Sequence, residues 1–233
     1  LFLLIISSVL LMLSVTILLK KMEKMVKIHS NDELTALGEI SSKTNSDPFR
    51  ILISTILSHR TRDVNTSKAS KNLFSVINSP QDLNEIDLKL LVDLIKPVAF
   101  YNVKARRLKQ VSVELITEFN GVVPDNIDDL LSLTSVGRKT ANCVLVYGFG
   151  LPAIPVDTHV HRISNRLNLV STTDPDDTEF ELNNLIPKKY WLNVNELFVR
   201  FGQTVCAPIK PNCNVCSLTN NCSFYKKISQ PKN

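Results

Sequence analysis

The sequence has little of what β-sheet proteins are built from. Alternation of Val with Thr is scarce, and aromatic residues make up only 6% of the chain. Stretches rich in Leu, Ile and Lys at helical spacing dominate instead. With 233 residues, the chain is long enough to bury a core as one large domain or two modest ones. We therefore expect an all-α fold.

Strong charge of either sign is also missing. The formal net charge is +5, which permits a nucleic-acid partner but does not require one. No repeat or low-complexity tract appears between Met25 and the C-terminus. Composition therefore leaves the function open, and the motifs must decide it.

Cysteine is nearly absent before the C-terminal end, where four cysteines form the cluster Cys206-x6-Cys213-x2-Cys216-x5-Cys222. Four thiolates on one compact loop bind either tetrahedral zinc or an iron–sulfur cube. Zinc sites usually pair two Cys-x-x-Cys knuckles, whereas this loop has one knuckle with a single cysteine on each side. The spacing favours a structural 4Fe–4S cluster, leaves zinc as the alternative and disfavours disulfides, which secreted scaffolds spread along the chain.

An uncharged apolar stretch, "LFLLIISSVLLMLSVTILL" (residues 1–19), precedes a group of lysines that begins at Lys20. As a helix it would measure about 28 Å at about 1.5 Å per residue, which just spans a bilayer core. No basic region precedes it, as one would in a cleaved signal. Two interpretations of residues 1–24 stay open. They are either a membrane anchor with the rest of the chain on the cytoplasmic side, or translated upstream sequence with the true start at Met22 or Met25.

Helix signals recur along the remaining chain. Asp47 followed by Pro48 marks an N-cap and a first helical position. The helix in "AFYNVKARRLKQVSVELITEF" is expected to end at Asn120-Gly121. Next, "NIDDLLSL", the turn "TSVG" and "RKTANCVLVYGF" predict two helices joined by a hairpin. A further helix is expected in "DTHVHRISNRLNLV", with Asp157 near its start.

The hairpin is a candidate anion site. Gly137 lets the backbone approach a ligand closely, and the positive end of the second helix favours an anion such as a DNA phosphate. Such contacts fix register without reading sequence. Hairpins of this kind also occur in helical proteins that bind nothing, so the motif alone does not establish DNA binding.

Lys139 follows the hairpin directly. A lysine that acts as a nucleophile must first lose its proton, which desolvation or nearby positive charge promotes. Arg138 and the positive end of the helix both act in that direction. The alternative is a solvated or phosphate-contacting lysine. Asp157 likewise is either a plain N-cap or an active-site acid, and the two roles are compatible because a capped carboxylate is held rigidly.

Taken together, "VGRKTANCVLVYGFGLPAIPVDTHVHRISNRL" and "FGQTVCAPIKPNCNVCSLTNNC" resemble the endonuclease III branch of the helix-hairpin-helix DNA glycosylases. The resemblance covers about residues 25–224. It implies two helical lobes with a DNA cleft between them. One is a six-helix lobe, residues 41–151, that contains the hairpin. The other joins residues 25–40 to residues 152–225 and carries a 4Fe–4S cluster on the four cysteines, with 226–233 as a tail.

The resemblance also implies roles for residues. Lys139 matches the family's catalytic lysine, which attacks C1′ of a damaged nucleotide and forms an imine that permits β-elimination. Asp157 matches the catalytic aspartate, which helps activate the amine and stabilises positive charge on the sugar. The implied partner is duplex DNA with damaged bases or abasic sites, bound by a monomer in the cytoplasm at the nucleoid, or in a nucleus.

Further positions are implied around the damaged nucleotide, which must leave the base stack. Arg60 falls where the family often has Gln, and Phe100 falls where a Leu wedge is common. Both are expected to fill the gap, although Phe100 as a core aromatic is the alternative. Asp63 matches an acid near the mouth of the site, and is equally consistent with a helix-surface acid. The implied hairpin contacts to DNA come from Ser135, Gly137, Arg138 and Thr140.

The sequence departs from the family pattern at the hairpin. It reads Thr134-Ser135-Val136-Gly137 where the family usually has Pro-Gly-Val-Gly, so Ser135 is expected to strain the turn or shift its phosphate contact. The loop "APIKPN" between the first two cysteines has Lys210 as its only basic residue, fewer than many relatives have.

The leading interpretation is a base-excision-repair glycosylase with abasic-site lyase activity that removes oxidised pyrimidines. A thymine or uracil mismatch glycosylase on the same scaffold is the first alternative. Lys139 argues against the adenine-specific branch, which generally lacks a lysine there. A non-catalytic iron–sulfur protein that binds DNA, or one tethered to a membrane, is an alternative of another class.

Overall fold

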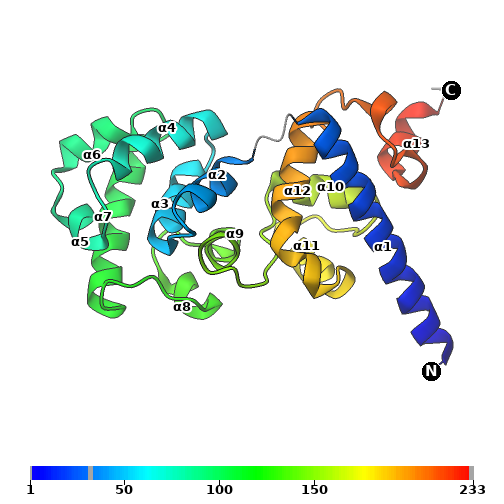
Figure 1. Cartoon of the computed structure of the whole chain (residues 1–233), viewed down its shortest axis with the longest axis horizontal. Coiled ribbons are helices and arrows are strands. Elements are labelled where there is room, and N and C mark those ends of the chain that lie inside the picture. Colours follow the sequence, from blue (N-terminus) through cyan, green and yellow to red (C-terminus); the bar gives the residue numbers. More distant parts are fainter. Residues whose placement is uncertain (1, 31–33, 231–233) are drawn as a thin grey trace. The chain divides into compact units, whose positions relative to one another are not determined.

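The computed structural model describes residues 2–30 and 34–230, and within these ranges the chain is helical and contains no strand (Figure 1). This confirms the predicted all-α class. The chain divides into two compact units, Thr35–Ala153 and a unit formed by Leu1–Leu34 with Ile154–Asn233. The first unit starts ahead of the expected residue 41 because Thr35 is the N-cap of its first helix, where its hydroxyl accepts from the Gly38 N–H at 3.2 Å.

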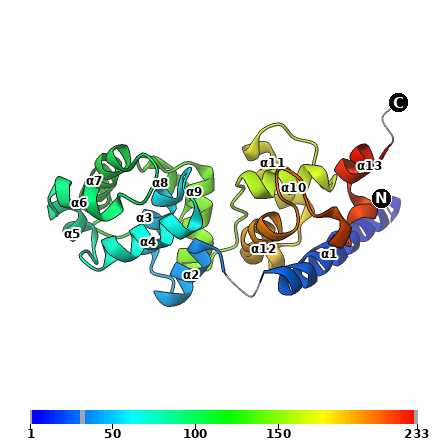
Figure 2. The same cartoon turned by 90° about the horizontal axis from the view of Figure 1, so that it is seen from above.

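The Thr35–Ala153 unit is built around α3. Residues 51–57 of this helix are buried without interruption, as expected for a helix that is apolar on all sides. It packs against α2, α4, α7, α9 and the following π-helical turn η1. Helices α5, α6 and α7 pack together at one end of the unit (Figure 2). The elements are α2 (Ala36–Lys43), α3 (Pro48–Ser58), α4 (Asp63–Phe74), α5 (Pro80–Glu85), α6 (Leu88–Ile95), α7 (Tyr101–Glu118), α8 (Ile127–Ser132), α9 (Arg138–Cys143) and η1 (Val144–Gly148).

Local signals fix the ends of these helices as the sequence predicts. The Asp47 carboxylate accepts from the Phe49 N–H at 2.9 Å, and Pro48 occupies the first turn of α3. Helix α7 ends at Glu118, and the chain then turns through left-handed φ angles of 54° at Asn120 and 76° at Gly121. The Gly121 N–H closes the turn on the Leu115 carbonyl at 2.8 Å.

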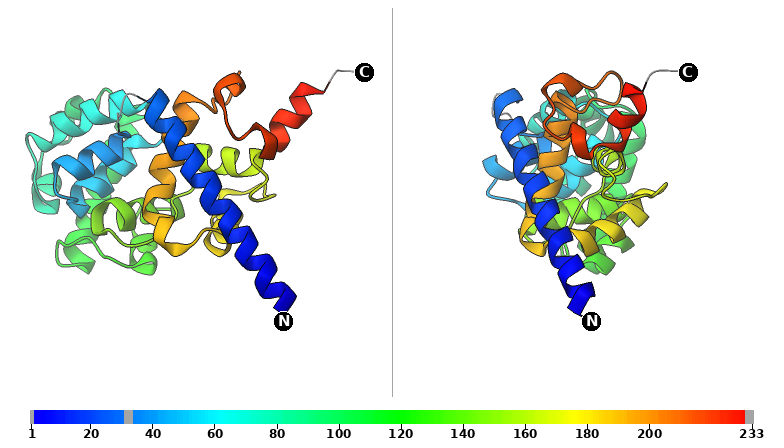
Figure 3. Two further views of the ribbon diagram at one scale, coloured as in Figure 1. Left: turned by 45° about the vertical axis from the view of Figure 1, so that its right-hand side comes forward. Right: turned by 90° about the vertical axis from the view of Figure 1, so that its right-hand side faces the viewer.

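The second unit is built around α12, in which Phe198 and Phe201 are almost completely buried. Helices α1 and α10 both pack against α12, and α10 also contacts α11 and α13 (Figure 3). The elements are α1 (Phe2–His29), α10 (Thr158–Arg166), α11 (Pro175–Leu185), the 3₁₀ turn η2 (Lys188–Tyr190), α12 (Trp191–Thr204), the short 3₁₀ turns η3 (Cys213–Val215) and η4 (Thr219–Asn221), and α13 (Ser223–Ser229).

The apolar N-terminal stretch forms the larger part of α1, which continues without a break to His29. From residue 15 onward one face of α1 belongs to the core of the second unit, through Val15, Leu18, Leu19, Met22, Met25 and Val26. Among the residues whose side chains the structure describes, 13–30 and 34–230, no helix is both long enough and apolar enough to cross a bilayer.

The predicted hairpin joins α8 to α9. Its residue Ser135 has a φ of 66°, a left-handed conformation that costs most side chains about 1–2 kcal/mol and glycine almost nothing. Val136, by contrast, is buried, and its N–H closes the turn on the Leu133 carbonyl at 3.1 Å. The sequence-based expectation that Ser135 strains the turn is therefore confirmed.

Replacing Ser135 with glycine should relieve this strain. We expect Ser135→Gly to raise the free energy of unfolding by about 0.5–1 kcal/mol, measured by urea denaturation followed by circular dichroism. The matched control is Ser132→Gly at the end of α8, where the same change lies in helical backbone and should lower stability. A destabilised Ser135→Gly protein would contradict this account of the turn.

Candidate active site

Lys139 lies in the first turn of α9, where it is half-buried. Gly137 is the N-cap of this helix, is exposed, and makes no side-chain capping hydrogen bond. The space where a Gly137 side chain would stand contains no atom within 4 Å. Arg138 beside it is exposed. The start of α9 thus presents backbone N–H groups, a guanidinium and an amine on one short segment.

The hairpin is fixed to α7 by two hydrogen bonds from Thr134 to the Glu114 carboxylate. One carboxylate oxygen accepts from the Thr134 N–H at 2.7 Å, and the other accepts from the Thr134 hydroxyl. Sequence reasoning missed Glu114 because nothing local marks a partner twenty residues away. The available signal was Thr134 itself, which stands where the family usually has proline, a residue without an N–H to donate.

Thr140 serves the interior of the unit. Its side chain is 2% exposed, and its hydroxyl lies 3.0 Å from Nε2 of His59, the C-cap residue of α3. Burial lowers the pKa of His59 to about 4, with smaller contributions from the positive charges of Lys139 and Lys104. A neutral imidazole therefore joins the end of α3 to the helix that carries Lys139. A DNA contact of Thr140 is left to its backbone N–H.

Arg60 and Phe100 lie side by side on two loops of the same unit. The guanidinium carbon of Arg60 is 5.5 Å from the centre of the Phe100 ring, within the range of a cation–π contact. Arg60 is exposed, and Phe100 is 59% exposed, which excludes the alternative that Phe100 is a core aromatic. Both residues have left-handed backbone, with φ of 54° and 58°.

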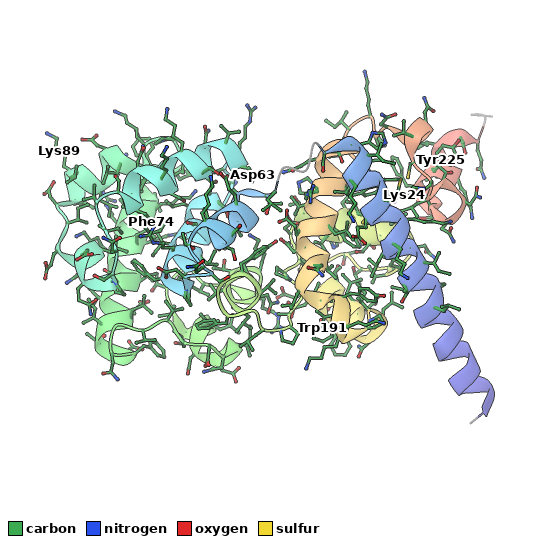
Figure 4. The ribbon with its side chains drawn as sticks, viewed as in Figure 1. Lys24, Asp63, Phe74, Lys89, Trp191 and Tyr225 are labelled. Carbon is green, nitrogen blue, oxygen red and sulfur yellow. The ribbon has the colours of Figure 1, made fainter. Side chains whose placement is uncertain are left out.

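Asp63 is the first residue of α4 and is half-buried (Figure 4). It stands three residues after Arg60, directly after the loop that joins α3 to α4. A negative charge at this position also interacts favourably with the positive end of the α4 dipole. The structure thus places Asp63 on the same segment as Arg60.

Asp157, in the second unit, is the N-cap of α10. One of its carboxylate oxygens accepts from the N–H groups of His159 at 2.8 Å and Val160 at 2.9 Å. The segment before it is fixed by the buried Asn195 of α12, whose side-chain amide donates to the Pro155 carbonyl at 2.8 Å. Sequence reasoning missed Asn195, since only the fold brings α12 to this segment. Asp157 is therefore rigidly held and half-buried.

The four C-terminal cysteines are free thiols that line one small cavity of the second unit. Burial raises the pKa of Cys213 and of Cys216, and the neighbouring sulfurs raise both further. Arg166 of α10 donates to the Cys206 sulfur at 3.4 Å. Over the described residues, no three His, Cys, Asp or Glu side chains already stand in the arrangement of a metal-ligand set.

The low pKa of His59 has a consequence for stability. The histidine takes up a proton near pH 6.5 when the chain is unfolded, but only near pH 4 when it is folded. Its contribution to stability is therefore complete above pH 6.5, is lost progressively as the pH falls from 6.5 to 4, and is absent below pH 4. We expect this loss to be about 2–3 kcal/mol.

The measurement compares denaturant unfolding of the parent protein with that of His59→Gln between pH 7.5 and pH 4. Glutamine keeps a hydrogen-bonding group for Thr140 but does not titrate, so the variant should lose less stability on acidification. Parallel curves for the two proteins would show that His59 is not the group responsible.

Known proteins share the sequence pattern and the fold of this chain. A model of the HhH-GPD superfamily of base excision DNA repair proteins matches residues 53–188. Endonuclease III of Thermotoga maritima is 50% identical over 182 residues, which cover 78% of this chain and 85% of that protein.

Two solved structures are similar over most of their length. A non-covalent endonuclease III–DNA complex has a TM-score of 0.82 and 33% identity, and the match covers 93% of this chain and 97% of that one. A trapped endonuclease III–DNA covalent intermediate has a TM-score of 0.76 and 36% identity, covering 79% and 87%. The chain belongs to the endonuclease III family of base-excision DNA glycosylases and abasic-site lyases.

Proposed function

We propose that this protein removes oxidised pyrimidines from duplex DNA and cleaves the resulting abasic sites through an imine on Lys139. The observation that carries the proposal is the position of Lys139 in the first turn of α9. The N-cap of this helix is a glycine, so no N-cap side chain occupies the N–H groups of the first turn. A phosphate bound by the N–H groups at this helix start would bring the neighbouring sugar within reach of the amine. The trapped covalent complex of an endonuclease III with DNA supports the same chemistry.

The reaction begins with attack of the Lys139 amine on C1′. The glycosidic bond breaks, and its electron pair leaves with the base, which takes up a proton. One of the two protons on the nitrogen passes to the departing base, and the other passes to O4′ as the C1′–O4′ bond breaks and the sugar ring opens, which gives an imine between Nζ and C1′. Removal of a proton from C2′ then expels the 3′ phosphate, and water releases the lysine.

Asp157 would stabilise the positive charge that develops on the sugar as the base departs. Its carboxylate has one oxygen engaged by two N–H groups, and this rigid capping fixes the direction of the other oxygen. A charge that is held in place before the reaction needs no reorganisation during it. Arg60 and Phe100 would fill the space that the extruded nucleotide leaves, one by hydrogen bonds to the opposite base and the other by stacking.

We also propose that Cys206, Cys213, Cys216 and Cys222 hold a 4Fe–4S cluster. The residues fit such a group because four free thiols line one cavity, and their mutual effect on pKa is the repulsion that a bound cation would relieve. When bound, the cluster would fasten the C-terminal loop to α10 and α12. No catalytic step is assigned to it.

Borohydride trapping tests the role of Lys139. The protein mixed with an abasic-site duplex and borohydride should form a covalent complex, because reduction converts the imine into a stable amine. We expect Lys139→Ala to abolish trapping and strand cleavage, while Lys89→Ala, which changes an exposed lysine of α6 (Figure 4), leaves both unchanged. Undiminished cleavage by Lys139→Ala would refute the mechanism.

Asp157→Asn provides a second arm of this experiment. Asparagine is as good an N-cap as aspartate, so the substitution removes the charge and retains the helix start. Turnover should fall by about 100-fold or more with DNA binding retained, whereas equal losses of both would mean that Asp157 acts only as a cap.

Duplexes with single lesions, including thymine glycol and G·T or G·U mismatches, test the substrate. The protein should cleave the duplex with the oxidised pyrimidine in preference to the mismatched ones.

Metal analysis tests the cluster. The purified protein should show the visible charge-transfer absorption of an iron–sulfur protein and contain iron and sulfide in equal amounts. Replacing Cys216 with Ala should lower the iron content of the protein and the thermal stability of the second unit. Stoichiometric zinc without iron would contradict the assignment.

A further inference from the structure

Lys104, near the start of α7, is a lysine with its charge inside the protein. Only 5% of the residue is exposed. Its ammonium donates to the Leu57 carbonyl at 2.6 Å, the His59 carbonyl at 2.7 Å and the Thr61 hydroxyl at 3.0 Å. All three acceptors are uncharged oxygens. A buried ammonium is costly unless its donors are satisfied, and here three N–H bonds are made to three acceptors.

The same amine connects three segments of chain. Leu57 belongs to the last turn of α3, and its carbonyl is among those that a helix leaves without an intrahelical partner. Thr61 lies in the loop after α3, and its hydroxyl also accepts from the Ala99 N–H at 3.2 Å. Ala99 precedes α7. The end of α3, the loop that follows it and the approach to α7 are thus joined at one buried charge.

These contacts are made by the sequence neighbours of Arg60 and Phe100. Arg60 stands between His59 and Thr61, both of which bind the Lys104 ammonium. Phe100 follows Ala99, and its own carbonyl accepts from the Lys104 backbone N–H at 3.0 Å. Left-handed backbone at non-glycine residues persists only where the surroundings enforce it. Lys104 supplies those surroundings for both residues.

We propose that Lys104 is a positioning residue that holds Arg60 and Phe100 in the conformation that enters DNA. The inference rests on the proposed gap-filling roles of these two residues. Lys104 touches neither the sugar nor the base in this account, and it acts through the backbone that presents the two exposed side chains. Burial lowers the pKa of Lys104 to about 8, so the amine is still mainly protonated at neutral pH and can make all three bonds.

The chain offers a matched control on the same helix. Lys109 of α7 donates to the Asn84 carbonyl at 2.7 Å and also to the Ile86 carbonyl. It therefore fastens backbone carbonyls as Lys104 does, but at the α5–α6 loop, away from Arg60 and Phe100 in the sequence. Lys104→Met and Lys109→Met remove the same donor from the same helix and keep a side chain of similar length, although Lys104 is buried and Lys109 is half-buried.

The experiment uses a duplex with a non-cleavable abasic analogue and 2-aminopurine as the opposite base. Insertion of Phe100 and Arg60 beside the 2-aminopurine should change its fluorescence when the parent protein binds at saturation. We expect Lys104→Met to lose most of this change and to cleave an abasic duplex about tenfold more slowly or worse. Borohydride trapping on single-stranded abasic DNA, which has no opposite base, should stay within about twofold of the parent by the same reasoning. Lys109→Met should resemble the parent in all three measurements.

A Phe100→Ala background distinguishes positioning from general destabilisation. If Lys104 acts through Phe100, the Lys104→Met loss should be smaller in that background, since coupled residues do not add. Should Lys104→Met fail to fold, Thr61→Val tests the same set of contacts with a smaller change. It removes the hydroxyl that accepts from both the Lys104 ammonium and the Ala99 N–H.

The outcomes separate this inference from the proposed function. A parent protein that borohydride fails to trap on abasic duplex DNA would defeat the Lys139 mechanism itself. A Lys104→Met protein with the parent's fluorescence change and duplex rate would overturn only the inference. Equal losses in Lys104→Met and Lys109→Met would also overturn it, because the effect would then reflect stability.

Discussion

The Thr35–Ala153 unit depends on hydrogen bonds to the last backbone carbonyls of its central helix, α3. Helix α3 is buried for two turns, so its last carbonyls cannot reach water, and the Lys104 ammonium takes the place of solvent there. From that point the chain runs directly into Arg60, while the His59 side chain reaches across to Thr140 beside Lys139. One buried charge and one neutral imidazole thereby connect the groups proposed to enter DNA with the helix proposed to react with it.

Left-handed backbone occurs at these same groups, as well as at turns elsewhere in the chain. Arg60, Phe100 and Ser135 all have left-handed φ angles, and all three are exposed or half-buried residues with proposed contacts to DNA. Strained residues of this kind cluster where a protein must present a fixed shape to a ligand. The supports for them come from the interior, from Lys104 beneath the first two and from Glu114 beside the turn of the third.

The sequence predicted what is local and missed what is tertiary. The cap at Asp47, the left-handed turn at Gly121 and the cap at Asp157 each follow from residues within a few positions of one another, and each is found as expected. Lys104 and Glu114 read as ordinary helix-surface residues, because their partners lie 20 or more residues away in sequence. The apolar part of α1 was interpreted as a membrane anchor or as translated upstream sequence, and neither interpretation predicted that its residues from Val15 onward join the core of the second unit. An apolar run has no feature that distinguishes a bilayer from a protein core.

The division of the chain between its two units has a consequence for synthesis. The Thr35–Ala153 unit is continuous in sequence, so it has all its parts as soon as residue 153 leaves the ribosome. The other unit combines α1 with helices that begin at Thr158. The apolar face of α1 must therefore wait, unpaired, through translation of the whole intervening unit before α12 can cover it, and during that interval it is a target for chaperones or for aggregation.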